Sequence, residues 1–227
     1  MGWSDRIRGA EVEPSVYGAD FSRLGEQIGA LLDAGCRIFH FDVGDGHFVE
    51  PITMGPIVLQ SISPIIHRQG GAIDVHLMVE RPAKYFEAVA KAGGDSVTFH
   101  YEAVDDVAAT VAAARAQGLQ AGVAFNPETE PESVAAATGD ADLALCMAIH
   151  PGYSGQPFRE ETFGRVERLR AALPESIHIQ VDGGVVPENI RRLRDCGATL
   201  LVAASSIFAR DDPPAAYREL VLEALTQ

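Results

Sequence analysis

The sequence predicts an α/β fold, a single (β/α)₈ TIM barrel, and three observations lead to this prediction. The chain has 227 residues, close to the roughly 250 residues that are typical of such a barrel. Short runs rich in β-branched residues alternate with longer amphipathic stretches rich in alanine and leucine. The alternation occurs eight times, which favours parallel βαβ connections. We therefore expect residues 1–227 to form one domain.

The expected strands are short and regularly spaced. They span residues 13–17, 37–43, 72–79, 96–100, 120–125, 143–149, 178–181 and 199–203. Apolar residues recur at helical spacing between them, and Gly35, Gly93, Gly118 and Gly197 stand where helices are expected to end. An open doubly wound sheet is the alternative. The turn after the first strand, YGADFS, lacks the glycine fingerprint that is usual in that fold.

Composition excludes several classes of partner. The net charge is -14, so the chain lacks the basic character that nucleic-acid binding requires. No apolar run reaches the ~18 residues of a membrane span. The first residues contain no apolar segment typical of a secretory signal, and we expect a cytoplasmic protein. Three widely separated cysteines predict neither a disulfide framework nor a structural zinc site.

Four side chains of metal-ligand type are expected at one end of the barrel, where barrel enzymes place their active sites. His40 and Asp42 are two residues apart in FHFDVGDGHF, so both side chains point to the same side of the strand. His76 takes an inward position in IDVHLMV, with Asp74 below it, and Asp182 ends the seventh strand in IQVDGG. Each alone is well explained as a hydrogen-bonded strand-end residue. Together they predict a site for one divalent ion, zinc, iron or manganese.

The remaining histidines are interpreted as structural or peripheral, including the one beside Glu102 that ends the fourth strand. They are His47, His67, His100, His150 and His178.

Glycine-rich segments after the last three strands predict an anion site. HPGYSGQPF follows the sixth strand and DGG the seventh, while AASSIF follows the eighth and allows Ser205 and Ser206 to open a short helix. Glycine lets backbone N–H groups approach an anion closely. Loops after strands seven and eight, with a short helix, commonly bind phosphate in barrel enzymes. A phosphorylated substrate is therefore expected.

The order of these motifs resembles that of the ribulose-phosphate 3-epimerases. PSVYGADFSRLGEQI, HFDVGDGHFVEPITMGP, DVHLMVERPAKYF, PGYSGQPF, VDGG and ASSIF support the resemblance from about Val12 to the last helix. It implies a barrel of the ribulose-phosphate-binding type and epimerisation of D-ribulose 5-phosphate to D-xylulose 5-phosphate in the pentose phosphate pathway. The allulose-6-phosphate 3-epimerases are similar but act on a different sugar. We also expect a homo-oligomer.

The resemblance implies a role for individual residues. His40, Asp42, His76 and Asp182 match the metal ligands, and Asp42 and Asp182 match the paired acid and base. An enediolate forms when the C3 hydrogen beside the C2 carbonyl is removed, and inversion requires one carboxylate on each face of the substrate. The residues matched to substrate and phosphate binding are Ser15, His76, Met78, Met147, Gly152, Tyr153, Ser154, Gly155, Gly183, Gly184, Ala204 and Ser205.

The chain departs from the family pattern at five positions, which are Gly44, Glu50, Pro51, Ser154 and Ala204. Gly44 replaces the usual methionine, which predicts that one wall beside the reacting carbons is missing and that a ketohexose 6-phosphate would fit. Three functions therefore stay open: a ribulose-phosphate 3-epimerase, a 3-epimerase of another ketose phosphate, and a non-catalytic phosphosugar-binding barrel.

Overall fold

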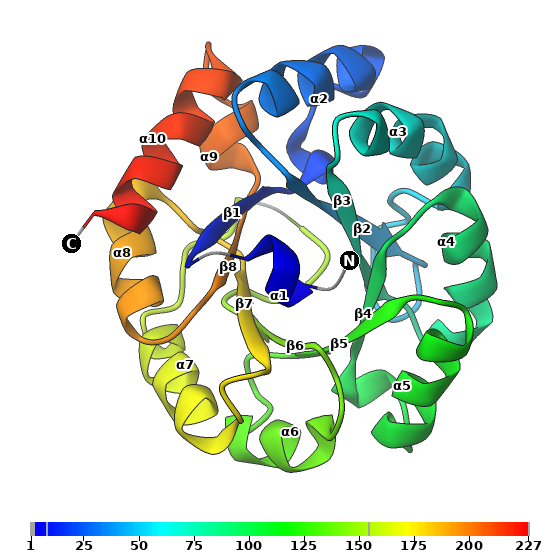
Figure 1. Ribbon diagram of the computed structural model, residues 1–227. Coiled ribbons are helices and arrows are strands. Elements are labelled where there is room, and N and C mark those ends of the chain that lie inside the picture. Colours follow the sequence, from blue (N-terminus) through cyan, green and yellow to red (C-terminus); the bar gives the residue numbers. More distant parts are fainter. Residues whose placement is uncertain (1–2, 8, 154, 227) are drawn as a thin grey trace.

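Eight parallel strands form a nearly closed barrel in the computed structural model, which describes residues 3–7, 9–153 and 155–226 (Figure 1). Each strand from β2 to β8 pairs with its neighbours in sequence, and β1 pairs with β8. A single bridge between Ser15 and His40 joins β1 to β2. The strands are β1 Glu11–Pro14, β2 Ile38–Gly44, β3 Ala72–Met78, β4 Ser96–His100, β5 Gln120–Phe125, β6 Leu143–Met147, β7 His178–Asp182 and β8 Leu200–Ala203.

Helices surround the barrel, so the predicted TIM-barrel architecture is confirmed (Figure 1). They are α1 Trp3–Arg6, α2 Leu24–Asp33, α3 Pro56–Arg68, α4 Phe86–Ala92, α5 Val107–Ala116, α6 Pro131–Thr138, α7 Glu161–Ala172, α8 Pro187–Asp195, α9 Ser205–Phe208 and α10 Pro213–Leu225. Local signals set their ends: Asp106 caps α5 by accepting from Ala109 N at 2.9 Å, and Gly93 ends α4 at φ 91°. Among the described residues, no helix is long and apolar enough to cross a membrane.

The first strand begins and ends earlier than the sequence predicts. β1 ends at Pro14, and Val16–Gly18 instead forms a 3₁₀ turn in which Gly18 N donates to Ser15 O. Val16 and Tyr17 are residues typical of strands, but here the chain bends over the barrel mouth. Ser15 therefore lies at the rim rather than within the strand.

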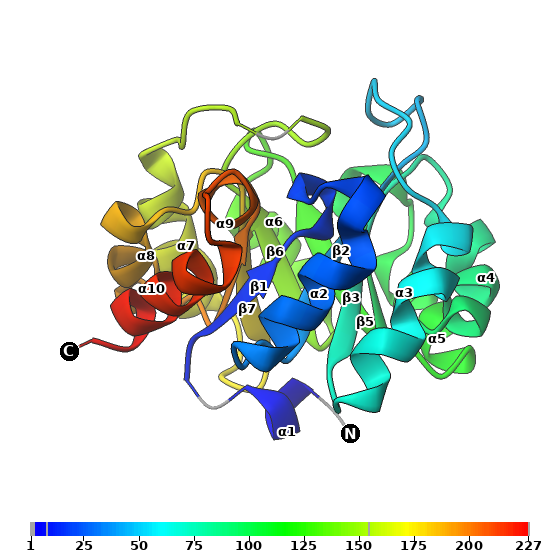
Figure 2. The same ribbon diagram turned by 90° about the horizontal axis from the view of Figure 1, so that it is seen from above.

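Alternation along the strands separates the barrel interior from the layer under the helices. On β2, Phe39 and Phe41 pack in the outer hydrophobic layer, whereas Ile38 belongs to an apolar cluster that also contains Trp3. α1 lies beneath the barrel, at the end opposite the long loops (Figure 2), and Trp3 is buried there. The interior thus has an apolar floor, and its polar residues are placed towards the mouth.

Candidate active site

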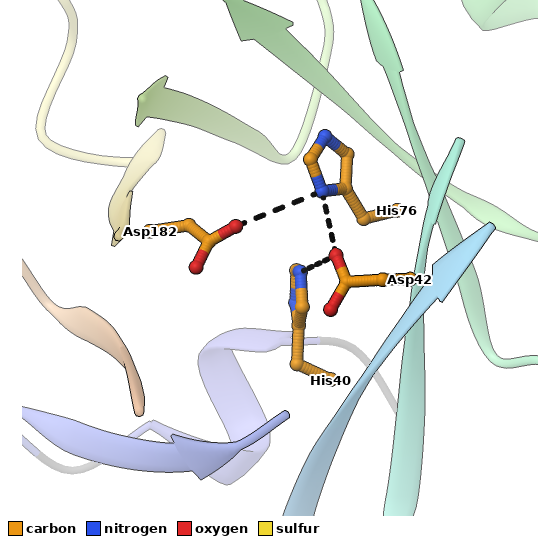
Figure 3. A group of neighbouring side chains, drawn as sticks. All are labelled: His40, Asp42, His76 and Asp182. Carbon is orange, nitrogen blue, oxygen red and sulfur yellow. Dashed lines mark hydrogen bonds and ion pairs between the residues drawn. The ribbon is translucent and has the colours of Figure 1, made fainter. Parts of the chain in front are cut away.

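Four side chains converge at the C-terminal mouth of the barrel (Figure 3). Inward alternation brings His40 and Asp42 from β2 and His76 from β3 to the axis, and Asp182 reaches it from the end of β7. One potential ligand atom from each residue lies within 4.8 Å of those of the other three. The convergence predicted from FHFDVGDGHF, IDVHLMV and IQVDGG is present in the structure.

The two histidines present different ring nitrogens to the carboxylates. His76 Nδ1 lies 3.0 Å from Asp42 Oδ1 and 3.9 Å from Asp182 Oδ2. His40 Nε2 lies 3.2 Å from Asp42 Oδ1, yet it is a buried nitrogen without a hydrogen-bond partner among the described residues. A cation at this point would satisfy that orphaned nitrogen, and two imidazoles with two carboxylates suit zinc, iron or manganese. The residues present therefore fit one divalent ion.

A fully buried polar layer supports His40 from below. His40 Nδ1 lies 3.2 Å from Asp74 Oδ2 and 3.7 Å from Glu13 Oε2. Gln180 Nε2 donates to both carboxylates, and Ser96 Oγ donates to Asp74 Oδ1. Such partners on the second ring nitrogen fix which nitrogen of a ligating histidine faces the metal. His40 is therefore set to present Nε2.

The two carboxylates at the mouth have different proton affinities in the metal-free protein. Burial, and then the negative charge of Asp42, raises the pKa of Asp182 to about 7. Burial acts to raise the pKa of Asp42 as well, but the charge of His40 and the close approach of the His40 and His76 ring nitrogens hold it well below its ordinary value. Ser15 Oγ also donates to Asp42 Oδ2 at 2.6 Å. Near neutral pH one carboxylate is ionised and the other readily holds a proton, which is the pattern of an acid/base pair.

A pocket opens above the cluster and contains most of the residues expected to bind substrate. It is lined by Ser15, Tyr17, Asp42, Met78, Met147, Ile149, Pro151, Gly152, Tyr153, Gly155, Asp182, Gly183, Gly184, Val185, Val186, Val202, Ala204 and Ser205. His76 is instead buried beneath the pocket, and Ser154 lies outside the described residues. Sequence reasoning missed Tyr17, which follows Ser15 by two positions at the rim, and several apolar residues that adjoin the glycine motifs.

Two positions show why the pocket wall needs glycine. Gly183 has φ 110°, and a Cβ there would come within 2.4 Å of the Ile149 side chain. Gly184 has φ 66°, and a Cβ there would lie 3.0 Å from Phe158 Cβ. A side chain at either position would be strained and would push the adjoining loop away. Ala204 is accommodated because the residue beside its methyl group is Gly18. A Cβ at position 18 would come within 3.2 Å of the Ala204 methyl carbon.

Comparison with known proteins identifies the family. Residues 11–208 match the model of the ribulose-phosphate 3 epimerase family. The chain belongs to this family. It is therefore an epimerase of the isomerase class, and the resemblance seen in the sequence motifs is confirmed.

Relatives match nearly over their full length. The ribulose-phosphate 3-epimerase of Bacillus subtilis (strain 168) is 36% identical over 92% of this chain and 97% of its own. That of Escherichia coli (strain K12) is 38% identical over 93% of each chain. Among solved structures, a 3-hexulose-6-phosphate synthase superposes with a TM-score of 0.69 at 20% identity over 94% of this chain and 99% of its own. The orotidine 5'-phosphate decarboxylase of Pyrococcus horikoshii OT3 superposes with a TM-score of 0.69 at 15% identity, over 95% of this chain and 100% of its own. These two similarities concern the fold alone.

The expectation of a missing wall at Gly44 is wrong. A Cβ at this position would lie 2.8 Å from the carbonyl oxygen of Pro51 and 2.9 Å from Val49 Cγ2. Thr53 Oγ1 also accepts from Gly44 N at 2.7 Å and donates to Asp42 O at 2.8 Å. The loop after β2 therefore folds back onto the strand end, and its own atoms fill the space that a side chain at 44 would take.

Changing Gly44 to alanine is expected to destabilise the protein by about 1–3 kcal/mol, the usual cost of overpacking. The backbone of Pro51 cannot yield without moving Thr53, which holds the carbonyl of Asp42. Urea unfolding measures the change in the free energy of unfolding. Gly29→Ala is the matched control, because a Cβ in this α2 position meets no atom within 4 Å and should stabilise the helix by up to about 1 kcal/mol. Equal effects at both positions would contradict the packing described.

Most other histidines lie away from the cluster, as interpreted. His47, His67 and His150 are exposed, and His178 begins β7 at the opposite end from Asp182. His100 differs, because it is fully buried and its Nε2 lies 2.9 Å from His76 Nε2. Its position at the end of β4, beside the strand that bears His76, is the sequence signal that could have connected it to the site.

Proposed function

We propose that this chain catalyses the metal-dependent epimerisation of a ketose phosphate at C3, converting D-ribulose 5-phosphate to D-xylulose 5-phosphate. The observation that carries the proposal is the cluster of His40, Asp42, His76 and Asp182 beneath a pocket with a glycine-rich rim. Relatives named ribulose-phosphate 3-epimerase support the choice of substrate.

The four residues of the cluster would hold one divalent ion. When bound, that ion would supply Lewis-acid chemistry, lowering the energy of negative charge on the substrate oxygens next to the reacting carbon. The imidazoles and carboxylates also hold one another in place, since Asp42 Oδ1 lies within 3.2 Å of a nitrogen of both histidines. Little rearrangement is then needed when substrate arrives.

Asp42 and Asp182 are suited to opposite proton transfers. They reach the mouth from β2 and β7, strands that are not neighbours in the barrel, and Figure 3 shows their carboxylates approaching the centre from different sides. One carboxylate removes the C3 hydrogen from one face, and the other returns a proton on the opposite face, so the configuration inverts. The carboxylate that removes the C3 hydrogen in one direction delivers a proton in the other, so the roles of Asp42 and Asp182 exchange in the reverse direction.

The pocket is lined by both apolar side chains and glycine-rich backbone. Met78, Met147 and Ile149 line it beside the carboxylates, and their side chains exclude water from the enediolate. The pocket is also lined by Gly183, Gly184, Gly155, Ala204 and Ser205, whose backbone N–H groups, with the Ser205 hydroxyl, would bind the phosphate.

The pentulose is preferred to a hexulose because of the loop after β2. Room beside Gly44 would favour a larger sugar, but Val49 and Pro51 occupy it. A non-catalytic binding protein is disfavoured, since the chain belongs to the ribulose-phosphate 3 epimerase family and its curated relatives are named as epimerases.

A substrate comparison tests the proposal. With zinc, iron or manganese supplied, kcat/KM for ribulose 5-phosphate should exceed that for free ribulose by at least about 100-fold, because each hydrogen bond to a charged group contributes about 1.5–3 kcal/mol. Allulose 6-phosphate serves as the larger phosphorylated sugar and should be turned over less well than the pentulose. A clear preference for the free sugar would overturn the phosphate assignment, and a preference for the hexulose would overturn the assignment of the pentulose.

A further inference from the structure

His100 and Glu102, at the C-terminal end of β4, extend the cluster on the side of His76 that faces away from Asp42 and Asp182. The second ring nitrogen of His76 points away from Asp42 and Asp182 (Figure 3) and lies 2.9 Å from His100 Nε2. The other nitrogen of His100, Nδ1, lies 3.3 Å from Glu102 Oε2. His100 is fully buried, with its ring between those of His76 and Phe48, at centroid distances of 5.0 and 4.7 Å. The three side chains thus form one chain of hydrogen bonds.

The chemistry of the donors fixes the direction of this chain. Glu102 also accepts at Oε1 from Asn126 N at 2.8 Å and from Thr129 Oγ1. A glutamate side chain is ordinarily ionised at neutral pH, and these hydrogen bonds favour the ionised form. As a carboxylate, Glu102 can only accept from His100. His100 must then hold a proton on Nδ1. Its burial disfavours a second, charging proton, and Nε2 is left as an acceptor. The contact at 2.9 Å consequently requires the proton on His76 Nε2.

We propose that His100 and Glu102 are positioning residues, which hold a proton on His76 Nε2 so that Nδ1 is the nitrogen offered to a metal. In the metal-free protein, His76 Nδ1 either holds a second proton, directed at Asp42, or has a lone pair; Nε2 keeps its proton in both cases. Asp74 has the corresponding role for His40, but the two ring nitrogens are exchanged. His40 Nδ1 faces Asp74, and its Nε2 faces the centre of the cluster. The consequence for metal binding rests on the proposed function, whereas the assignment of protons does not.

The proton positions can be read directly from the wild-type protein. Long-range ¹H–¹⁵N correlation spectra of ¹⁵N-histidine-labelled protein distinguish the two neutral tautomers of each ring. His100 should be neutral with its proton on Nδ1, and His76 should be protonated on Nε2, both without metal and with diamagnetic zinc. A His100 proton on Nε2 would overturn the proposal even in a fully active epimerase.

Glu102→Gln should reverse the direction of the hydrogen bonds that connect residue 102, His100 and His76. Asn126 N and Thr129 Oγ1 both donate to Oε1, so they would keep the amide oxygen on their side and turn the NH₂ group towards His100 Nδ1. His100 would then shift its proton to Nε2 and donate to His76. Zinc affinity, measured by competition with a chromophoric chelator, should fall about 10–100-fold, the range for partners of metal ligands.

Glu128→Gln is the matched control, since Glu128 lies in the loop after β5 that also holds Asn126 and Thr129, but its side chain is more exposed and pairs with His150 and Arg159. It should leave zinc affinity and the tautomers unchanged, and far-UV circular dichroism should show that both variants are folded. An unchanged zinc affinity in Glu102→Gln would overturn the positioning role. Loss of affinity with His100 still protonated on Nδ1 would overturn the proposed cause.

Discussion

Asp182→Asn is expected to abolish inversion at C3, with turnover falling by about 10²–10⁴-fold, the usual contribution of a positioned acid or base. An amide cannot take a proton from carbon or deliver one, and Asp182 is the carboxylate that approaches the centre from a different side than Asp42. Asp42→Asn should have an effect at least as large, because Asp42 also contacts both histidines. Interconversion of the two epimers is followed by NMR integration.

Asp106→Asn provides the control for this change. Asp106 caps α5 at the surface, and asparagine caps helices as well as aspartate does, so turnover should not change. If Asp42→Asn and Asp182→Asn both kept near-normal turnover, the assignment of two carboxylates to the reaction would be wrong.

Purified protein is expected to contain close to one transition-metal ion per chain, and His76→Ala should lose it. Changes in partners of metal ligands already cost about 10–100-fold in affinity, so removal of a ligand should cost more. Elemental analysis after dialysis measures the metal content, and circular dichroism checks that the variant is folded. His67→Ala is the control, because His67 is exposed and pairs with Asp95 on the surface. An active wild-type enzyme without metal would contradict this account of the cluster.

The features that were predictable from sequence are those set by strand periodicity. In FHFD, inward His40 and Asp42 alternate with outward Phe39 and Phe41, and the structure follows this pattern through β2. β4 and β5 begin and end where the sequence predicts. A hydrophobic pattern fixes which face a residue takes, so it also fixes which polar residues share the barrel axis.

The features that sequence could not supply depend on contacts between distant segments. The space at Gly44 is filled by the return of its own loop, held by Thr53, and no local pattern measures that packing. His100 looks like a strand-end residue until β3 and β4 pair and bring it to His76. The first strand was misplaced because Val16 and Tyr17 have strand propensity but lie in a turn fixed by hydrogen bonds to Ser15 and Val16, which shows tertiary context overriding a weak preference.

The central claim is that two opposed carboxylates act at one carbon, and deuterium labelling in D₂O tests it most directly. Wild-type protein with ribulose 5-phosphate should form xylulose 5-phosphate with solvent deuterium at C3 and none at C1. Asp182→Asn should lose inversion, while the remaining base, Asp42, still exchanges the C3 hydrogen of the single epimer whose hydrogen faces it. Deuterium at C1 in the wild-type product, or exchange of both epimers by Asp182→Asn at the wild-type rate, would contradict the account.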